Sequence, residues 1–210
     1  MLRRQFGKAL ITLGFMAGLT TGTAFGAGPA PAEATAVVET LHKALLSAMK
    51  SAETTPVADR AARLGPVISS SFALNRMSQF AAGSGWRKMT DQQKSSYLSA
   101  FTDITIATYA NRFDGFSGES FATLGTEEAL NDSLLVRTEL RRPKKDPVRL
   151  TYVILGSEDG PKIVDIYLDG SISELARQRS EYQSVLRSSG ADALISGLQD
   201  QAERMLKTNG

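Results

Sequence analysis

The sequence predicts an α+β domain in which helices at both ends of the chain cover one face of a four-stranded antiparallel sheet. Two observations predict the sheet: four short apolar segments lie between residues 121 and 169, and the breaks between them carry turn-forming residues such as Asn131-Asp132 and Asp159-Gly160-Pro161. A third observation predicts the helices. Outside residues 121–169, apolar residues recur every three or four positions.

Length and composition favour one domain and exclude several functions. The chain has 210 residues, of which 42% are apolar and 22% charged, enough for one sizeable core. Arg3, Arg4 and Lys8 lie in a segment that we expect to be removed, so 21 of the 24 basic residues remain against 22 acidic ones. This balance argues against a nucleic-acid partner. The absence of cysteine excludes thiolate catalysis and cysteine-based metal sites.

Residues 1–26 carry the parts of an export signal: a basic start, an apolar run over residues 9–19, and small residues that suit cleavage after Gly26. The run is short for a membrane span, which needs about 20 residues. Residues 3–8 also resemble a twin-arginine signal, although no Ser or Thr precedes the arginines; an ordinary secretory peptide and an uncleaved anchor are the alternatives. We therefore expect a signal peptide at 1–26, a linker at 27–36 and one domain at 37–208.

The N-terminal helices are predicted from apolar spacing. An amphipathic helix carries Val38, Leu41, Leu45 and Met49 on one face. His42, the only histidine, lies on this helix beside charged residues and without a nearby ligand pair, so we expect it to be solvated or merely hydrogen-bonded rather than catalytic. Two shorter helices follow over residues 57–82, with a break expected near residues 69–71.

The next helix has the clearest boundaries in the sequence. Thr90 and Gln93 form a capping box, and the helix continues towards Phe113 with a broad apolar face that can be core or cavity wall. After the sheet, Ser173 can cap a further helix that ends at Gly190. A last helix is predicted over residues 192–206.

The four predicted strands are Phe121–Leu124, Leu134–Arg141, Val148–Leu155 and Ile163–Leu168. Apolar and polar residues alternate in the second strand and mostly in the third, as in a sheet with one solvated face. A basic cluster lies at the tip of the hairpin between these two strands. It can meet lipid phosphates or an acidic partner, or it can be a solvated tip that protects the strand ends. The cluster consists of Arg141, Arg142, Lys144 and Lys145.

Catalytic motifs are scarce. The sequence lacks a phosphate-binding loop, a dinucleotide fingerprint and a His-Glu-x-x-His motif, and residues 115–118 lack the spacing of a nucleophile elbow. Asp103 and Asp165 are the acids whose positions predict burial, and a buried carboxylate with a raised pKa can act as a base. A hydrogen-bonded structural carboxylate is the alternative for both.

Two groups of residues resemble a known family. Before the sheet stand Gly85-Trp86, Met89-Thr90, Gln93, Tyr97, Phe101 and Tyr109. The second group begins in the last predicted strand and continues beyond the sheet: residues 165–173, residues 179–182, Gly190, Leu194-Ile195 and Leu198. Their order and spacing resemble periplasmic lipid-binding proteins of the MlaC and toluene-tolerance family, and residues 168–175 are closest to its hopanoid-associated branch, HpnM. Met89 and Tyr182 depart from the family's usual Leu and Phe.

The resemblance implies a twisted sheet related to the cone-shaped NTF2-like fold, which encloses an apolar cavity with the helices. Acyl chains would enter this cavity, while the lipid head group would stay near its mouth; the basic hairpin cluster would contact the head group or a partner. The residues expected to line the cavity, each of which can instead be core, are Trp86, Tyr97, Phe101, Ile104, Tyr109, Val136, Leu150, Tyr152, Ile154 and Ile166.

The resemblance also implies a function. It implies a monomeric, soluble periplasmic carrier without a cofactor, metal or enzymatic activity. Such a carrier passes phospholipid between an outer-membrane lipoprotein complex and an inner-membrane ABC transporter; a hopanoid is the alternative cargo. Two rival functions stay open. One is an NTF2-like enzyme that uses Asp103 or Asp165 with Tyr109, and the other is an interaction protein without a cavity.

Overall fold

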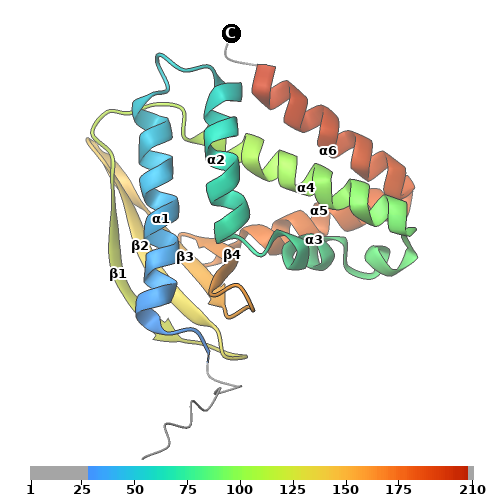
Figure 1. Ribbon diagram of the computed structural model, residues 1–210, viewed down its shortest axis with the longest axis horizontal. Helices are drawn as coiled ribbons and strands as arrows, with labels where there is room; N and C mark the ends of the chain where they lie inside the picture. The colour runs from blue at the N-terminus through green and yellow to red at the C-terminus, as the bar shows by residue number, and fades with distance from the viewer. Residues whose placement is uncertain (1–27, 208–210) are drawn as a thin grey trace, which may run out of the picture.

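The computed structural model describes residues 28–207, which form an α+β fold with an antiparallel sheet on one side of a group of helices (Figure 1). The expected export signal lies outside the described residues. The helices are α1 (Pro31–Lys50), α2 (Val57–Ser71), α3 (Leu74–Ala82), the 3-10 helix η1 (Gly83–Lys88), α4 (Asp91–Arg112), α5 (Glu174–Ser188) and α6 (Gly190–Lys207). Within residues 28–207, no helix is both long and apolar enough to cross a membrane.

The described sheet has five strands in the order of the sequence: β1 (Ser120–Glu128), β2 (Leu134–Arg142), β3 (Lys145–Leu155), β4 (Lys162–Leu168) and β5 (Ile172–Ser173). All neighbouring strands are antiparallel. The prediction of four strands is therefore wrong. Asp169 and Gly170 adopt positive φ angles of 48° and 80°, and this tight turn returns the chain so that β5 pairs with the end of β4. Two residues are too few to show a strand periodicity.

One face of the sheet packs against the helices, and α1 lies across it (Figure 1). Val136 of β2 and Ile154 of β3 on this inner face are fully buried, whereas Arg137 and Arg149 point to the exposed outer face. The outer-facing Arg137 forms an ion pair with Glu127 of β1. The alternation that predicted a sheet with one solvated face is thus present in β2 and β3.

Helix α1 begins earlier than expected and includes residues 31–36 of the predicted linker. Pro31 stands at the first helical position, where its missing N–H is not needed and its fixed φ suits a helix. Alanine-rich sequence follows, which favours helix, and Ala34 is completely buried. The assignment of residues 31–36 to a linker is therefore wrong.

The break between α2 and α3 falls at Phe72-Ala73, directly after the serines near which it was expected. Phe72 has extended backbone angles and bridges to Ile163 of β4, and the Ala73 N–H donates to the Ile163 carbonyl at 2.9 Å. The chain leaves the helix here because its backbone groups bind the sheet.

Helix α4 begins as the sequence predicts. The Thr90 hydroxyl accepts a hydrogen bond from the Gln93 N–H at 3.2 Å, and the Gln93 side chain accepts one from the Thr90 N–H at 3.0 Å. The first half of α4 is packed tightly: Tyr97 and Phe101 are fully buried, and both meet Tyr182 of α5 edge-on with ring centroids 6.4 and 6.3 Å apart.

A buried arginine joins the ends of three helices. Arg60 of α2 is 2% exposed, and its guanidinium donates to the carbonyls of Ala52 and Thr55 just after α1 and of Ala110 near the end of α4. These carbonyls lie at or near helix C-termini, where a cation is stabilising. Arg60 therefore fixes the end of α4 against the turn between α1 and α2.

Candidate functional site

A cavity of about 480 Å³ lies between the inner face of the sheet and the second half of α4. Cavities of about 300–1,000 Å³ are typical of small-molecule sites. The apolar and aromatic residues of its wall come from four helices (α1, α3, α4 and α5), three strands and the residues that follow α2 and α4. They are Met49, Phe72, Met77, Ile104, Tyr109, Phe113, Leu140, Val148, Leu150, Tyr152, Ile166, Leu168 and Leu175.

The structure places five of the expected cavity residues at this wall: Ile104, Tyr109, Leu150, Tyr152 and Ile166. They share the inner face of β3 and β4 or the second half of α4. Because side chains two residues apart on a strand point to the same side, Leu150 and Tyr152 face the cavity together.

The other five expected residues lie away from this cavity wall. Tyr97 and Phe101 belong to the packed half of α4, and the Tyr97 hydroxyl donates to the Ser78 carbonyl at 3.1 Å. Trp86 lies in η1 and packs on Tyr97, with the ring centroids 6.3 Å apart. Val136 and Ile154 are completely buried in the core. These residues fill the core rather than line the cavity.

Several wall residues were not predicted. Met49 and Phe72 show the helical spacing of ordinary core residues, and nothing in their pattern separates wall from core. Phe113 ends α4 and stacks on Tyr109 with a centroid distance of 5.9 Å and an interplanar angle of 5°. Its position in space depends on where the chain leaves the helix.

The mouth of the cavity is polar. Arg112, Asp114, Ser117, Glu119 and Arg142 line it together with the start of α5. Arg142 comes from the predicted basic hairpin cluster, and its guanidinium also donates to the Asp146 carbonyl. The mouth thus carries charges of both signs around an apolar interior.

The other three cluster members lie at the hairpin outside the cavity wall. Arg141 pairs with Glu139 at 3.5 Å, Lys144 occupies the turn with a φ of 61°, and Lys145 begins β3. All three side chains are exposed. The hairpin therefore places one arginine at the mouth and leaves three cations beside it.

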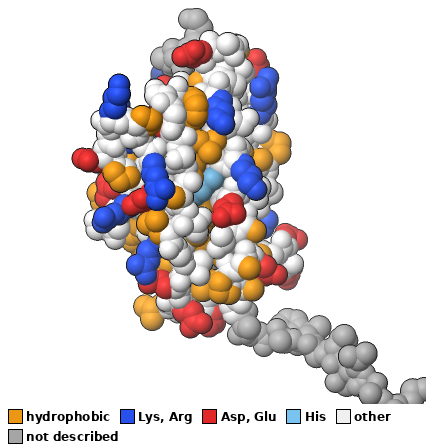
Figure 2. Space-filling model, turned by 90° about the vertical axis from the view of Figure 1, so that its left-hand side faces the viewer, with side chains coloured by type: hydrophobic (Ala, Val, Ile, Leu, Met, Phe, Trp, Pro, Cys, Tyr) orange, Lys and Arg blue, Asp and Glu red, His pale blue; other side chains and the backbone are white. Residues whose placement is uncertain are grey.

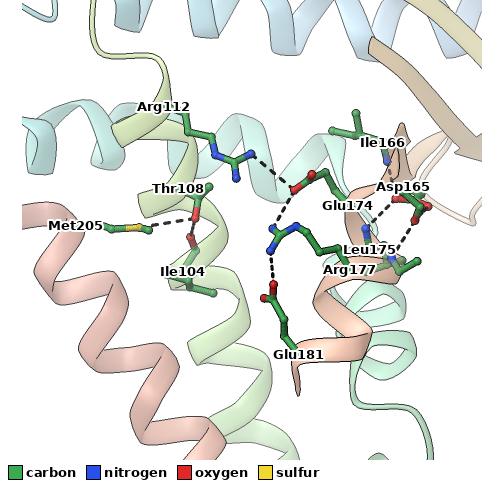
Figure 3. A network of polar contacts seen from close by, with 12 residues as sticks. Ile104, Thr108, Arg112, Asp165, Ile166, Glu174, Leu175, Arg177, Glu181 and Met205 are labelled. Atoms are coloured by element: carbon green, nitrogen blue, oxygen red, sulfur yellow. Dashed lines mark hydrogen bonds and ion pairs between the residues drawn. The ribbon is translucent and has the colours of Figure 1, made fainter. Parts of the chain in front are cut away.

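A network of charges holds the start of α5 at the mouth (Figure 3). Arg112 at the end of α4 and Arg177 on α5 both approach Glu174, at 3.7 and 3.0 Å, and Arg177 also binds Glu181 at 2.6 Å. Arg112 and Arg177 are more than one-third exposed, so each pair adds little stability. Their main effect is to orient α5 against the end of α4.

Of the two candidate acids, Asp165 lines the cavity, but its carboxylate is already hydrogen-bonded. Asp165 accepts hydrogen bonds from the Ser173 hydroxyl at 2.6 Å and from the N–H groups of Ile166 and Leu175 at 2.7 and 3.1 Å (Figure 3). Asp165 thus accepts a hydrogen bond from a backbone N–H in the first turn of α5 that has no partner within the helix. This is the role of a hydrogen-bonded structural carboxylate, the alternative to a catalytic base. Asp103 is exposed on α4, so the prediction of burial is wrong for this residue: it faces solvent, away from the cavity.

His42 is buried, so the expectation of a solvated histidine is wrong and the hydrogen-bonded alternative holds. Its Nε2 lies 3.0 Å from the Tyr152 hydroxyl, and its ring stacks on Phe121 with centroids 3.9 Å apart. Burial lowers the pKa of His42 to about 4. Burial also raises the pKa values of Tyr109 and Tyr152 far above the usual range, so both stay protonated.

The face that carries α1 and β1 shows no gathering of one charge (Figure 2). Basic, acidic and apolar side chains are interspersed there, and His42 shows only as a small recessed patch, in keeping with its 4% exposure. Within residues 28–207, no group of three His, Asp or Glu side chains has the arrangement of a metal site.

Comparison with known proteins gives a family match and a structural match. The family profile described as MlaC protein matches residues 39–200. Among solved structures, the fold is similar to that of a phospholipid-binding protein from Ralstonia solanacearum in complex with a phospholipid, at 20% identity and a TM-score of 0.70 over 85% of this chain and 99% of that one. No curated protein matches the sequence. The structural match shows a shared fold.

Proposed function

We propose, from the premise that this chain belongs to the MlaC family, that it is a lipid-binding protein whose cavity holds the acyl chains of a phospholipid. The observation that carries this proposal is the cavity of about 480 Å³, which has an apolar wall and a polar mouth. The Ralstonia solanacearum protein of the same fold, which is solved with a phospholipid, supports it.

The apolar wall supplies the required free energy. Burying one methylene group is worth about 0.8 kcal/mol, so a sixteen-carbon chain needs on the order of 12 kcal/mol of apolar surroundings to leave a bilayer. A sheet face on one side and the second half of α4 on the other provide such surroundings. Because a bilayer solvates the chain equally well, transfer in either direction is nearly balanced and partner proteins can set its direction.

The mouth suits the head group of the lipid. Arg142 lies on the cavity wall at this end, and the remaining hairpin cations stand beside it. Each cation near an anionic lipid surface contributes about 1 kcal/mol. We propose that the hairpin cluster of Arg141, Arg142, Lys144 and Lys145 contacts the phosphate of the cargo or an acidic surface on a partner.

Family membership supports a wider role. The proposed role is a periplasmic carrier that works as a monomer between an outer-membrane lipoprotein complex and an inner-membrane ABC transporter, after export directed by residues 1–26. The likeness of residues 168–175 to the HpnM branch makes a hopanoid the second candidate cargo.

Binding is favoured over catalysis by the state of the polar groups. In an NTF2-like enzyme of the kind considered, an acid would be hydrogen-bonded to a tyrosine in the pocket. Among residues 28–207, Asp165 is instead held by Ser173 and the start of α5, and Asp103 faces solvent. Of the two tyrosines that line the cavity, Tyr152 has its hydroxyl hydrogen-bonded to His42 rather than to an acid.

Native mass spectrometry of the protein purified from its own periplasm, followed by solvent extraction, tests the proposal. We expect a near-stoichiometric phospholipid or hopanoid. Ile166→Glu places a charge on the cavity wall and should remove the lipid, whereas Val153→Glu, on the neighbouring strand and likewise half-buried but outside the cavity wall, should retain it. Circular dichroism checks that both variants fold. A lipid-free wild-type mass that does not change after incubation with either lipid class would refute the proposal.

A further inference from the structure

Two tyrosines bring hydroxyl groups to the wall of the cavity, which is mostly apolar but also includes Thr105 and Thr108. Tyr109 comes from α4 and Tyr152 from β3, and both rings form part of the wall. The cavity wall therefore carries hydroxyl groups among its apolar side chains.

The Tyr109 hydroxyl has no hydrogen-bond partner among residues 28–207, and it does not belong to the fully buried atoms, so a ligand can reach it. The ring cannot readily turn elsewhere, because it stacks on Phe113 and packs on Phe72 with a centroid distance of 5.6 Å. The half-buried ring forms part of the cavity wall, so the cavity is where its hydroxyl can find a partner.

The Tyr152 hydroxyl is held in place from behind the wall. His42 Nε2 lies 3.0 Å away, and His42 itself is fixed by its stacking on Phe121. A neutral imidazole nitrogen either accepts the tyrosine proton or donates to the tyrosine oxygen. In the first case Tyr152 keeps lone pairs for a ligand, and in the second it keeps its proton for one.

We propose that Tyr109, together with Tyr152 on the wall of the same cavity, forms a polar subsite that donates a hydrogen bond to an oxygen atom carried within the apolar body of the cargo. This inference rests on the proposed lipid-binding function. The cargo class it selects is a lipid with an ester carbonyl or a hydroxyl among its apolar groups, in preference to a pure hydrocarbon chain. A glycerol ester and a hydroxylated triterpenoid both supply that acceptor.

Binding measurements with matched lipids test the subsite. The probes are a diester phospholipid and its diether analogue with the same chains and head group, and a hydroxylated hopanoid and the corresponding hopane hydrocarbon. Wild-type protein should bind the oxygen-bearing member of at least one pair about 2- to 12-fold more tightly, the range that one net hydrogen bond gives. Tyr109→Phe should bind both members of that pair equally.

The matched control is Tyr97→Phe, which removes a hydroxyl that binds the Ser78 carbonyl outside this cavity. This variant should keep the wild-type ratio of affinities for the two members of a lipid pair.

Thermal unfolding gives a second readout. Because the Tyr109 hydroxyl is unpartnered, Tyr109→Phe should not lower the melting temperature of the lipid-free protein, but it should reduce the rise that the oxygen-bearing lipid causes.

The outcomes separate the two proposals. The pair that shows the preference identifies the source of the oxygen acceptor. Equal binding of both members of both pairs by the wild type, or an unchanged ratio in Tyr109→Phe, overturns the subsite while the lipid-binding function stands. A wild-type protein that binds none of the four lipids overturns the proposed function itself.

Discussion

Acidification should destabilise this domain through one buried histidine. His42 has a pKa of about 4 in the folded protein because burial disfavours its charged form, and a histidine in an unfolded chain has a pKa of about 6.5. Above pH 6.5 the residue is neutral in both states. Between pH 6.5 and 4 the unfolded chain binds a proton that the folded protein excludes, so stability falls as the pH falls.

The magnitude follows from the two pKa values. They differ by about 2.5, and each pKa unit corresponds to about 1.4 kcal/mol, so His42 should lower the free energy of unfolding by about 3 kcal/mol between pH 7.5 and pH 4. The 4% exposure of the side chain leaves little solvent screening. Below pH 4 the folded protein is protonated as well, and the loss should level off.

Urea unfolding of wild type and His42→Gln at both pH values measures this contribution. Glutamine can retain a hydrogen bond to Tyr152 but does not titrate, and the carboxylates contribute equally to both proteins, so the difference isolates His42. As the only histidine, His42 also gives a single imidazole signal in an NMR titration. A midpoint near 6.5, or an identical pH dependence of the two proteins, would refute the reasoning.

Three further predictions concern stability. Phe101→Ala should lower the free energy of unfolding by about 3–5 kcal/mol in urea titrations, because it empties a packed site outside the cavity, while the mass of the bound lipid should not change. Thr90→Ala removes the side-chain half of the α4 cap and should cost about 1 kcal/mol, seen as a fall of about 2–4 °C in melting temperature. Arg60→Met removes the hydrogen-bond donor of three carbonyl groups and should lower the free energy of unfolding by about 2–4 kcal/mol. Unchanged urea unfolding would show that water replaces the guanidinium.

Much of the fold could be predicted from local sequence because its signals are local. The capping box at Thr90, the Ser173 cap of α5 and the Asn131-Asp132 turn all appear in the structure where the sequence predicts them. The α+β class and the antiparallel sheet are confirmed. The fifth strand was missed because its two residues are defined only by pairing with β4.

The site could be predicted only in part, for a different reason. Periodicity shows which residues avoid water but not whether another side chain or empty space lies opposite them. Phe101 and Tyr109 share the same apolar helix, yet the first packs on Tyr182 and the second lines the cavity. The burial of His42 likewise depends on Phe121 and Tyr152, which are distant in the sequence.

Helix α4 has two functionally different halves. Its first half is packed tightly in the core, and its second half lines the cavity. Its position is fixed by the Thr90 cap and the aromatic contacts of Tyr97 and Phe101 at one end, and by Arg60 at the other. Side chains from Ile104 onward that line the cavity border open space on one side. Mutations there can change ligand preference without loss of folding, so this half of the helix gives the protein a route by which new cargo specificity can evolve.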